Sequence, residues 1–451
     1  MDKGLKLPII KPENNGQADK IQPPLSALQT TLESMQRRYA NRNPKSLAFY
    51  NETLKHMPGA NTRTVLHALP FPLTISHGQS TTLFSVDGHS YIDFLSEYSA
   101  GIYGHSNATI KAAIVKALDG GWNFGGKNQY EGELAKILVE RFGNGMDMIR
   151  FCNSGTEANL MAIGAAIGFT GKQKILAFIG GYHGGPLSFP EASPKYSMNA
   201  KYDFILAPYN DIKATKAILS GLPPDSLAAI LVEGMQGAGG SIPGQLDFLH
   251  YLRMAATDYE ALFILDEVMT SRLAYRGLQS TLGISPDITT LGKWIGGGMG
   301  IGAFGGRREI MEMFDPRNGK LTHSGTFNNN VVTMAAGIAG CKIMDEDTVE
   351  KLNALGERLR NFIDTSIEKL LGAAATPKMY TTGLGSLFNI TFAGPEKDVL
   401  HAVFYHYLLE HGIYIATRGF ITMNIEHTEE HVETFGKVIE GFLAEYRDAL
   451  V

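Results

Sequence analysis

The sequence predicts an α/β protein with a large domain built on a mostly parallel sheet flanked by helices, and a smaller α+β domain. In the middle of the chain, short apolar runs end in polar or glycine-rich tips, and helical stretches follow them. Strands that alternate with helices form parallel sheets covered on both faces. Beyond about residue 344 the alternation stops. We expect an N-terminal segment over 1–90 that contributes to the small domain, a large domain over 91–345 and a small domain over 346–451.

Composition limits the classes of function. The chain has 451 residues, 44% of them hydrophobic, and a formal net charge of -5, which favours neither nucleic acid nor an anionic membrane as a partner. No apolar run reaches the roughly 18 residues of a membrane span, and the N-terminus lacks a secretory pattern. The two cysteines, Cys152 and Cys341, are too few for a disulfide framework or a metal cluster. We therefore expect a cytoplasmic protein without a bound metal.

The elements follow in order from the N-terminus. Residues 1–40 are polar without clear periodicity, and we expect about the first 20 to be mobile or to lie on a partner. Asp87-Gly88 between apolar pairs predicts a hairpin. From about residue 107, apolar residues are spaced like one face of a helix.

The strand and helix candidates of the rest of the chain are as follows. The middle of the chain offers strands over 148–152, 175–179, 204–207, 228–232 and 262–265, and the end offers strands over 385–391 and 412–415 with helices over 346–371, 397–411 and 428–447. Ligands of parallel sheets bind at the carboxyl ends of the strands. The polar tips at 153–157, 180–185, 233–237 and 266–268 should therefore converge on one site.

The tip with the clearest chemistry begins at Asp266. This acid follows the apolar run Ala-Leu-Phe-Ile-Leu, and a carboxylate at the end of a buried strand is costly unless it has a cationic partner. On this motif alone, Asp266 could be a metal ligand or a helix cap. It could also pair with a pyridinium nitrogen, which it would keep protonated so that the ring withdraws electrons.

Lys293 lies in an apolar, glycine-rich stretch after Asp266. A lone lysine is usually a solvated surface charge, but burial lowers the pKa of a lysine and prepares it for Schiff-base chemistry. The following Gly300-Ile-Gly302-Ala-Phe-Gly305 matches a dinucleotide fingerprint formally. The match is weak, because neither a clear preceding strand nor a suitably placed acid accompanies it.

Two further tips suit a phosphate and a flat ring. Asn153–Asn159 contains small residues between a strand and a helix expected from about Leu160. Such a turn presents backbone N–H groups to an anion, although it could equally be an ordinary N-cap. In Gly180–Gly185, Tyr182 stands between glycines and could stack on a ring or be a plain loop aromatic.

These motifs together resemble the class III aminotransferases of the aspartate aminotransferase fold. The resemblance covers about residues 48–447, and the motifs occur in family order: Asn153–Asn159, Tyr182-His183-Gly184, Glu233 with Gln236-Gly237, Asp266-Glu267-Val268, Lys293 and Gly325-Thr326-Phe327. It implies fold type I and a pyridoxal 5'-phosphate (PLP) cofactor.

The resemblance also implies residue roles. Lys293 would hold PLP covalently and later move a proton between carbon atoms, Asp266 would pair with the ring nitrogen, Val268 and Tyr182 would pack on the two ring faces, and Ser154, Gly155 and Thr156 would bind the phosphate. Glu233 would be an acid near the ring hydroxyl. Thr326 would reach the phosphate of a neighbouring subunit, which implies a homodimer with shared sites.

One difference from the motif of many class III enzymes bears on the predicted substrate. Many class III enzymes have Gln after Asp-Glu-Val, whereas Met269 follows here. The chain is similar to the branch that holds β-amino-acid aminotransferases of the β-phenylalanine type and glutamate-1-semialdehyde aminomutases. The stretches around Arg63 and Arg418 are similar to that branch's carboxylate-binding segments, although either arginine could be a surface charge.

The sequence thus predicts a transaminase that moves the amino group of a β-amino acid to a 2-oxo acid such as 2-oxoglutarate or pyruvate. An intramolecular aminomutase of glutamate semialdehyde is the alternative within the family. A silent PLP-fold regulator is disfavoured because Lys293 and Asp266 are both present. A nicotinamide-dependent dehydrogenase would rest on the glycine match alone.

Overall fold

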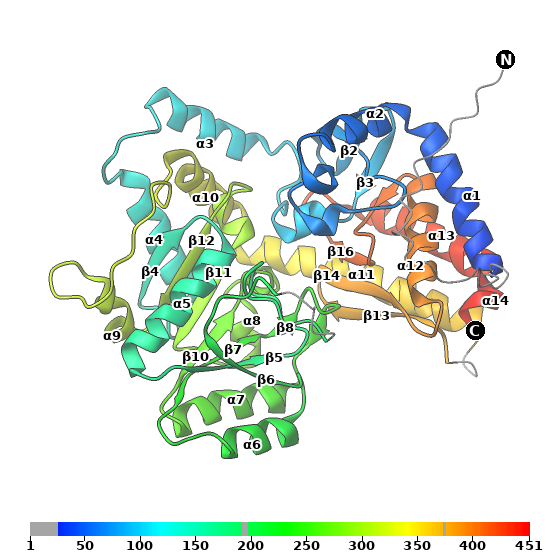
Figure 1. Cartoon of the computed structure of the whole chain (residues 1–451). Helices are drawn as coiled ribbons and strands as arrows, with labels where there is room; N and C mark the ends of the chain where they lie inside the picture. The colour runs from blue at the N-terminus through cyan, green and yellow to red at the C-terminus, as the bar shows by residue number, and fades with distance from the viewer. Residues whose placement is uncertain (1–25, 192–196, 373–375) are drawn as a thin grey trace.

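The computed structural model describes residues 26–191, 197–372 and 376–451. Figure 1 shows two lobes, with the N-terminal elements (blue) and the C-terminal elements (orange and red) sharing one lobe while the middle of the chain forms the other. The long helix α11 (Glu346–Leu371) runs from the junction into the shared lobe. The first residues of the chain, for which we predicted mobility, lie outside the described residues.

A seven-stranded sheet forms the centre of the middle lobe. Its strand order is β4-β12-β11-β10-β7-β5-β6, and every pair is parallel except the two that involve β12. The strands are β4 (Met148–Cys152), β5 (Lys174–Phe178), β6 (Asp203–Ala207), β7 (Leu227–Glu233), β10 (Leu262–Asp266), β11 (Ile288–Gly292) and β12 (Gly302–Gly306). The predicted mostly parallel sheet is confirmed, and two strands were not predicted, β11 and β12.

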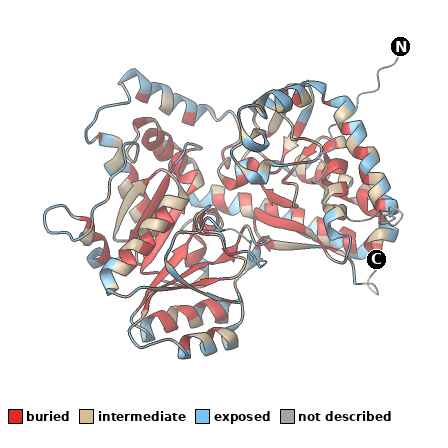
Figure 2. Cartoon of the chain, viewed as in Figure 1, coloured by how far each residue is buried: buried red, intermediate tan, exposed pale blue. Residues whose placement is uncertain are grey.

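Helices cover both faces of this sheet, and its central strands are buried (Figure 2). The helices of this lobe are α3 (Ala108–Asp119), α4 (Gln129–Phe142), α5 (Gly155–Thr170), α6 (Ile212–Ser220), α7 (Leu246–Asp258), α8 (Leu278–Leu282), α9 (Arg308–Met311) and α10 (Val331–Ile343). Burial on both faces explains why the strands appear in the sequence as continuous apolar runs.

Strand β12 holds two of the glycines of the formal dinucleotide fingerprint. In a dinucleotide site such glycines lie in a turn between a strand and a helix, whereas Gly302 and Gly305 pair with Cys152 and Ile149 inside the sheet. A Cβ at Gly302 would lie 1.9 Å from the carbonyl oxygen of Ser154. These glycines therefore permit close packing inside the sheet, with Gly302 next to the turn after β4, and the dehydrogenase interpretation loses its support.

The shared lobe joins the two ends of the chain. Strand β15 from the C-terminal part pairs in parallel with β3 from the N-terminal part, and the predicted hairpin at Asp87-Gly88 connects β2 and β3. The strands are β1 (Ile75–Gln79), β2 (Thr82–Ser85), β3 (Ser90–Asp93) and β15 (Ile413–Tyr414) in one sheet, and β13 (Met379–Leu384), β14 (Leu387–Phe392) and β16 (Phe420–Thr422) in another. The helices are α1 (Ala27–Arg42), α2 (Pro44–Thr53), α11, α12 (Lys397–Glu410), α13 (Glu429–Glu445) and α14 (Arg447–Leu450).

The expectation that residues 1–40 lack periodicity is wrong for the part that forms helix α1. Its buried residues are Leu28, Leu32, Met35 and Tyr39, which recur every three or four positions along one face. This face packs on α12. The apolar stripe is narrow and stands among glutamines, threonines and arginines, so the stretch looks polar in the sequence.

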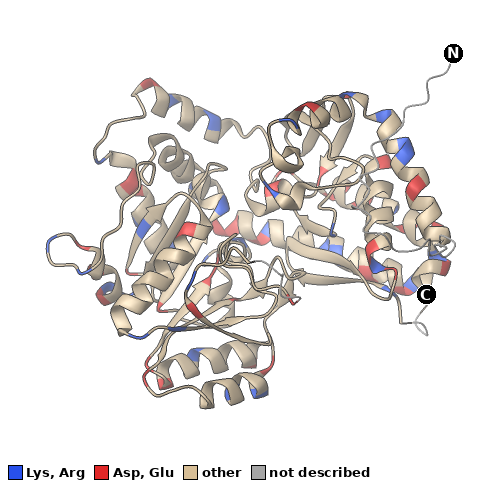
Figure 3. Cartoon of the chain, viewed as in Figure 1, with Lys and Arg blue, Asp and Glu red and all other residues tan. Residues whose placement is uncertain are grey.

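Charges of both signs are distributed over both lobes (Figure 3). Within the described ranges, no helix is both long and apolar enough to cross a membrane. The same residues contain no group of three or more His, Cys, Asp or Glu placed to hold a metal ion.

Candidate active site

A cavity of about 430 Å³ lies at the carboxyl ends of the central strands. Each of the four predicted polar tips contributes to its lining, so their predicted convergence is confirmed. The lining includes Asn153, Ser154, Gly155, Thr156, Tyr182, His183, Gly184, Glu233, Asp266, Val268, Met269 and Lys293.

The N-terminus of α5 opens into this cavity. The helix begins at Gly155 rather than near Leu160 as predicted, because Ser154 caps it: the Ser154 Oγ accepts a hydrogen bond of 3.1 Å from the Glu157 N–H. Close packing keeps the turn narrow, since a Cβ at Gly155 would lie 2.8 Å from Val268 Cγ1, and one at Gly184 would lie 2.3 Å from Thr156 Oγ1. Free N–H groups at such a helix start attract an anion.

Asp266 lies at the floor of the cavity and is almost fully buried. Its Oδ2 accepts hydrogen bonds from His183 Nδ1 (2.7 Å) and Asn159 Nδ2 (2.8 Å), and its Oδ1 accepts one from the Val268 N–H (2.9 Å). Burial alone would lower the pKa of His183, but its hydrogen bond and charge interaction with Asp266 raise that pKa above the ordinary value. The carboxylate is thus fixed in place by three donors, two of which the sequence analysis did not assign.

Lys293 follows β11 and points its amine into the same cavity. Its backbone is left-handed, with φ of 56°, and its Nζ donates a 2.5 Å hydrogen bond to the Tyr98 carbonyl oxygen. The residue is partly accessible from the cavity, yet protein surrounds its amine. This burial, together with the charge of Arg63, lowers the pKa of Lys293 to about 8. A lysine with such a pKa carries a usable free amine near neutral pH.

Glu233 ends β7 and lies behind Tyr182. One carboxylate oxygen accepts from the Tyr182 N–H (3.1 Å) and the other from the Gly237 N–H (3.0 Å). Burial raises the pKa of Glu233 to about 7, although the nearby His183 opposes the shift. Tyr182 itself lines the cavity and remains 47% exposed.

These residues fit PLP by their chemistry. The cavity combines a helix N-terminus for a phosphate, a fixed carboxylate for a ring nitrogen, a lysine with a lowered pKa for an aldehyde, and an accessible tyrosine and a valine for a flat ring.

A strained turn over Ser96–Ser99 completes the wall of the cavity, and the sequence analysis missed it. Four consecutive non-glycine residues have positive φ: Ser96 (42°), Glu97 (51°), Tyr98 (52°) and Ser99 (78°). Left-handed backbone costs about 1–2 kcal/mol per residue, so surrounding contacts must stabilise it. The sequence contains no signal for this turn, since glycine or asparagine would ordinarily mark it.

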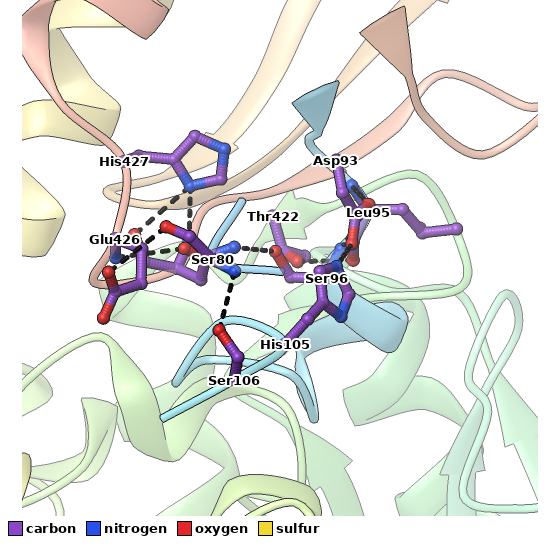
Figure 4. A network of polar contacts seen from close by, with 10 residues as sticks. Ser80, Asp93, Leu95, Ser96, His105, Ser106, Thr422, Glu426 and His427 are labelled. Carbon is purple, nitrogen blue, oxygen red and sulfur yellow. Dashed lines mark hydrogen bonds and ion pairs between the residues drawn. The ribbon is translucent and has the colours of Figure 1, made fainter. Parts of the chain in front are cut away.

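The stabilising contacts come from both ends of the chain (Figure 4). Asp93 Oδ1 accepts from the N–H groups of Leu95 (2.8 Å) and Ser96 (3.0 Å), and His105 Nε2 holds Asp93 Oδ2 at 2.9 Å. From the C-terminal part, Thr422 Oγ1 donates to the Leu95 carbonyl oxygen (2.7 Å). Asn424 Nδ2 donates to Ser96 Oγ (3.0 Å).

The two predicted substrate arginines lie on one aromatic ring. The guanidinium carbons of Arg63 and Arg418 are 5.2 Å and 6.0 Å from the Tyr98 ring centroid. Arg63 forms an ion pair with Glu97, and Arg418 Nη1 donates to the Ala238 carbonyl oxygen at 3.4 Å. The carbonyl oxygen of the same tyrosine accepts a hydrogen bond from Lys293, so Tyr98 contacts both arginines and Lys293.

Thr326 is not part of the cavity lining. It is exposed, and the next residue, Phe327, is 61% exposed. Its predicted contact with the phosphate of another subunit therefore stays a prediction.

Comparison with known proteins gives the family. Residues 65–435 match the family of class III aminotransferases. The chain is 45% identical to the β-phenylalanine transaminase of Variovorax paradoxus, over 93% of this chain and 97% of that protein. It is 35% identical to a glutamate-1-semialdehyde 2,1-aminomutase of Clostridium kluyveri, over 89% of this chain and 100% of that protein.

Solved structures that resemble this chain support the same family. A crystal structure of a β-phenylalanine aminotransferase from Variovorax paradoxus superposes with a TM-score of 0.90 at 44% identity, and it covers 94% of this chain and 99% of its own. A transaminase with PLP bound superposes with a TM-score of 0.84 at 31% identity, over 90% and 99% of the two chains. With its fold type I architecture and its cavity suited to PLP, this chain belongs to the class III aminotransferases.

Proposed function

We propose that this aminotransferase takes its amino group from a β-amino acid and passes it to a 2-oxo acid, such as 2-oxoglutarate or pyruvate, in two half-reactions. The observation that carries the proposal is the pair of arginines from opposite ends of the chain, Arg63 and Arg418, at the ring of Tyr98 beside Lys293. The similarity to a β-phenylalanine transaminase supports the same substrate class.

PLP, when bound, withdraws electrons from the substrate carbon next to its nitrogen. We assign its phosphate to Ser154, Gly155 and Thr156, its ring nitrogen to Asp266, and its ring faces to Tyr182 and Val268. We assign Glu233, which lies behind Tyr182, as the acid near the ring hydroxyl. Lys293, with a pKa of about 8, binds the cofactor and afterwards moves the proton between carbon atoms. His183 and Asn159 keep the Asp266 carboxylate aimed through their hydrogen bonds.

The two arginines can serve two substrates whose carboxylates lie at different distances from the reacting nitrogen. A β-amino acid carries its carboxylate one carbon farther from the reacting nitrogen than an α-amino acid does. One guanidinium at a fixed position cannot pair well with both, because bidentate geometry is demanding. Arg63 takes the β-amino acid carboxylate, and Arg418 takes the α-carboxylate of the 2-oxo acid and its amino product.

Single-turnover measurements of each half-reaction test this. A charge-assisted pair contributes about 1.5–3 kcal/mol, or roughly 10- to 150-fold in affinity. Arg63→Ala should weaken the half-reaction of β-phenylalanine far more than that of 2-oxoglutarate, and Arg418→Ala should do the reverse. Equal losses in both half-reactions, or none, would contradict the two-arginine assignment.

The active unit that we propose is a cytoplasmic homodimer with shared sites. The exposed loop that carries Thr326 and Phe327 supports a contact with a second copy. The two cysteines, Cys152 and Cys341, are free and buried, which supports a reducing compartment. Sedimentation of the holoenzyme measures the oligomeric state directly.

The second candidate is an aminomutase, which the similarity to glutamate-1-semialdehyde aminomutases favours. An aminomutase needs no external acceptor. Turnover of β-phenylalanine that depends on 2-oxoglutarate or pyruvate supports the transaminase. Turnover of glutamate semialdehyde without any 2-oxo acid supports the aminomutase.

A further inference from the structure

Arg63 already has a counter-ion before any substrate binds. Its Nη1 donates to Oε1 of Glu97, and the two side chains keep 38% and 61% of their surface exposed. A small ligand can therefore reach both groups. A carboxylate that binds Arg63 must displace the Glu97 carboxylate or share the guanidinium with it.

Glu97 also lies at the boundary between two cavities. It belongs to the lining of the cavity that contains Lys293, and to that of a second cavity of about 590 Å³. The second cavity is lined by Arg63 and Tyr98, by apolar residues such as Leu66, and by polar residues such as His77. A substrate held at Lys293 would extend its carboxylate and its apolar substituent into the second cavity. The Arg63–Glu97 pair lies on this path.

The backbone of Glu97 cannot move away easily. Its turn is left-handed over Ser96–Ser99, and Asp93 together with Thr422 and Asn424 hold the turn from both sides. Only the side chain of Glu97 is free to rotate. Strained backbone that the surroundings hold so firmly is typical of a functional position.

We propose that Glu97 is a specificity-determining residue that competes with the substrate carboxylate for Arg63. Glu97 neutralises Arg63 between turnovers, and a substrate binds productively when its carboxylate displaces that of Glu97. The inference rests on the proposed function, because it takes Arg63 as the partner of the donor carboxylate. A ligand of this site is a monocarboxylate with an apolar substituent: its carboxylate meets the guanidinium of Arg63, and its substituent meets the apolar part of the adjoining cavity.

Binding of 3-phenylpropanoate to the PLP-loaded enzyme, measured by isothermal titration calorimetry, tests the competition without turnover. This probe has the carboxylate and the apolar ring but no amine. An exposed ion pair of this kind contributes little, so Glu97→Gln should tighten binding about 1.5- to 5-fold. Arg63→Gln should weaken binding roughly 10-fold. In the Arg63→Gln background, Glu97→Gln should no longer tighten it.

Two further variants control the experiment. Glu429→Gln is the matched control, because Glu429 forms a comparable exposed pair with Arg358 at 2.8 Å on another surface, and its binding should equal that of the unchanged enzyme. Glu97→Asn removes the same charge with a residue type that tolerates left-handed backbone, so it should reproduce the effect of Glu97→Gln.

The outcomes separate the two proposals. If both Glu97 variants bind the probe equally or more weakly than the unchanged enzyme while Arg63→Gln still loses affinity, the competition is refuted and the role of Arg63 stands. If Arg63→Gln binds the probe normally, both the competition and the carboxylate assignment fail.

Discussion

Gly302→Ala should disrupt the turn assigned to the cofactor phosphate without removing a polar group. A Cβ at this position would lie 1.9 Å from the Ser154 carbonyl oxygen, 2.4 Å from its carbonyl carbon and 2.8 Å from Cys152 Sγ. Two of these atoms are backbone, so no side-chain rotation relieves the clash. The turn after β4 must shift by about 1 Å, since a real Cβ rarely approaches another heavy atom within 3.0 Å.

The structure gives the size of the effect. Overpacking of a buried site costs about 1–3 kcal/mol. The shift also weakens the Ser154 cap of α5, which contributes about 0.5–2 kcal/mol. The apoenzyme should therefore lose about 1.5–5 kcal/mol of unfolding free energy. Misaligned N–H groups at the helix start should weaken PLP binding roughly 10- to 100-fold.

Denaturant unfolding of the apoenzyme and spectroscopic titration with PLP measure the two losses. Gly164→Ala is the matched control: it lies in the same helix, α5, and a Cβ there would meet nothing within 4 Å. It should raise stability by about 0.5–1 kcal/mol, because alanine favours helix over glycine, and leave PLP affinity unchanged. Gly302→Ala with unchanged PLP affinity would refute the assignment of this turn to the phosphate.

Two other predictions concern Lys293. Lys293→Ala should lose the borohydride-reducible link to PLP and all turnover, and Thr326→Glu should lose turnover because a carboxylate repels the phosphate. If Thr326 serves the other subunit's phosphate, mixing the two variants should restore activity at about a quarter of the sites. No recovery of activity in verified mixed dimers would contradict the shared site. Because burial lowers the pKa of Lys293 to about 8, its free-amine fraction rises about tenfold per pH unit below that value and is nearly complete above it. The rate of apoenzyme reconstitution with PLP, followed by absorbance, should therefore level off near pH 8 to 9, and a rate still rising beyond that range would point to an ordinary lysine.

The convergence of the polar tips on one cavity could be predicted because it depends on local patterns. Buried parallel strands must be apolar throughout, so β7 and β10 are visible as runs, and a polar residue directly after such a run can only lie at the sheet edge where ligands bind. Asp266 was found by this rule. Lys293 was found by its apolar, glycine-rich surroundings, although β11 before it was not recognised as a strand.

Other features depend on contacts that no local pattern records. His183 was visible in its motif, but its role is decided by a hydrogen bond to Asp266, 83 positions away. Strand β12 is glycine-rich because neighbouring backbone lies too close for a side chain at Gly302, Gly305 and Gly306, and local propensity disfavours glycine in a strand. Helix α1 buries its stripe only because α12 lies against it.

The sequence by itself determined five of the seven strands of the central sheet, the family of motifs and the residues assigned to the cofactor, because period, apolarity and strand ends are local properties of the chain. Only the tertiary structure decided how the wall of the cavity around Tyr98 and Arg63 is built. The left-handed turn over Ser96–Ser99 has no sequence signal, and it exists because residues more than 300 positions away, Thr422 and Asn424, hold it. That turn brings Tyr98 to Lys293 and Glu97 to Arg63. Strained backbone persists where distant contacts outweigh its cost, and those contacts form only when both ends of the chain share one lobe.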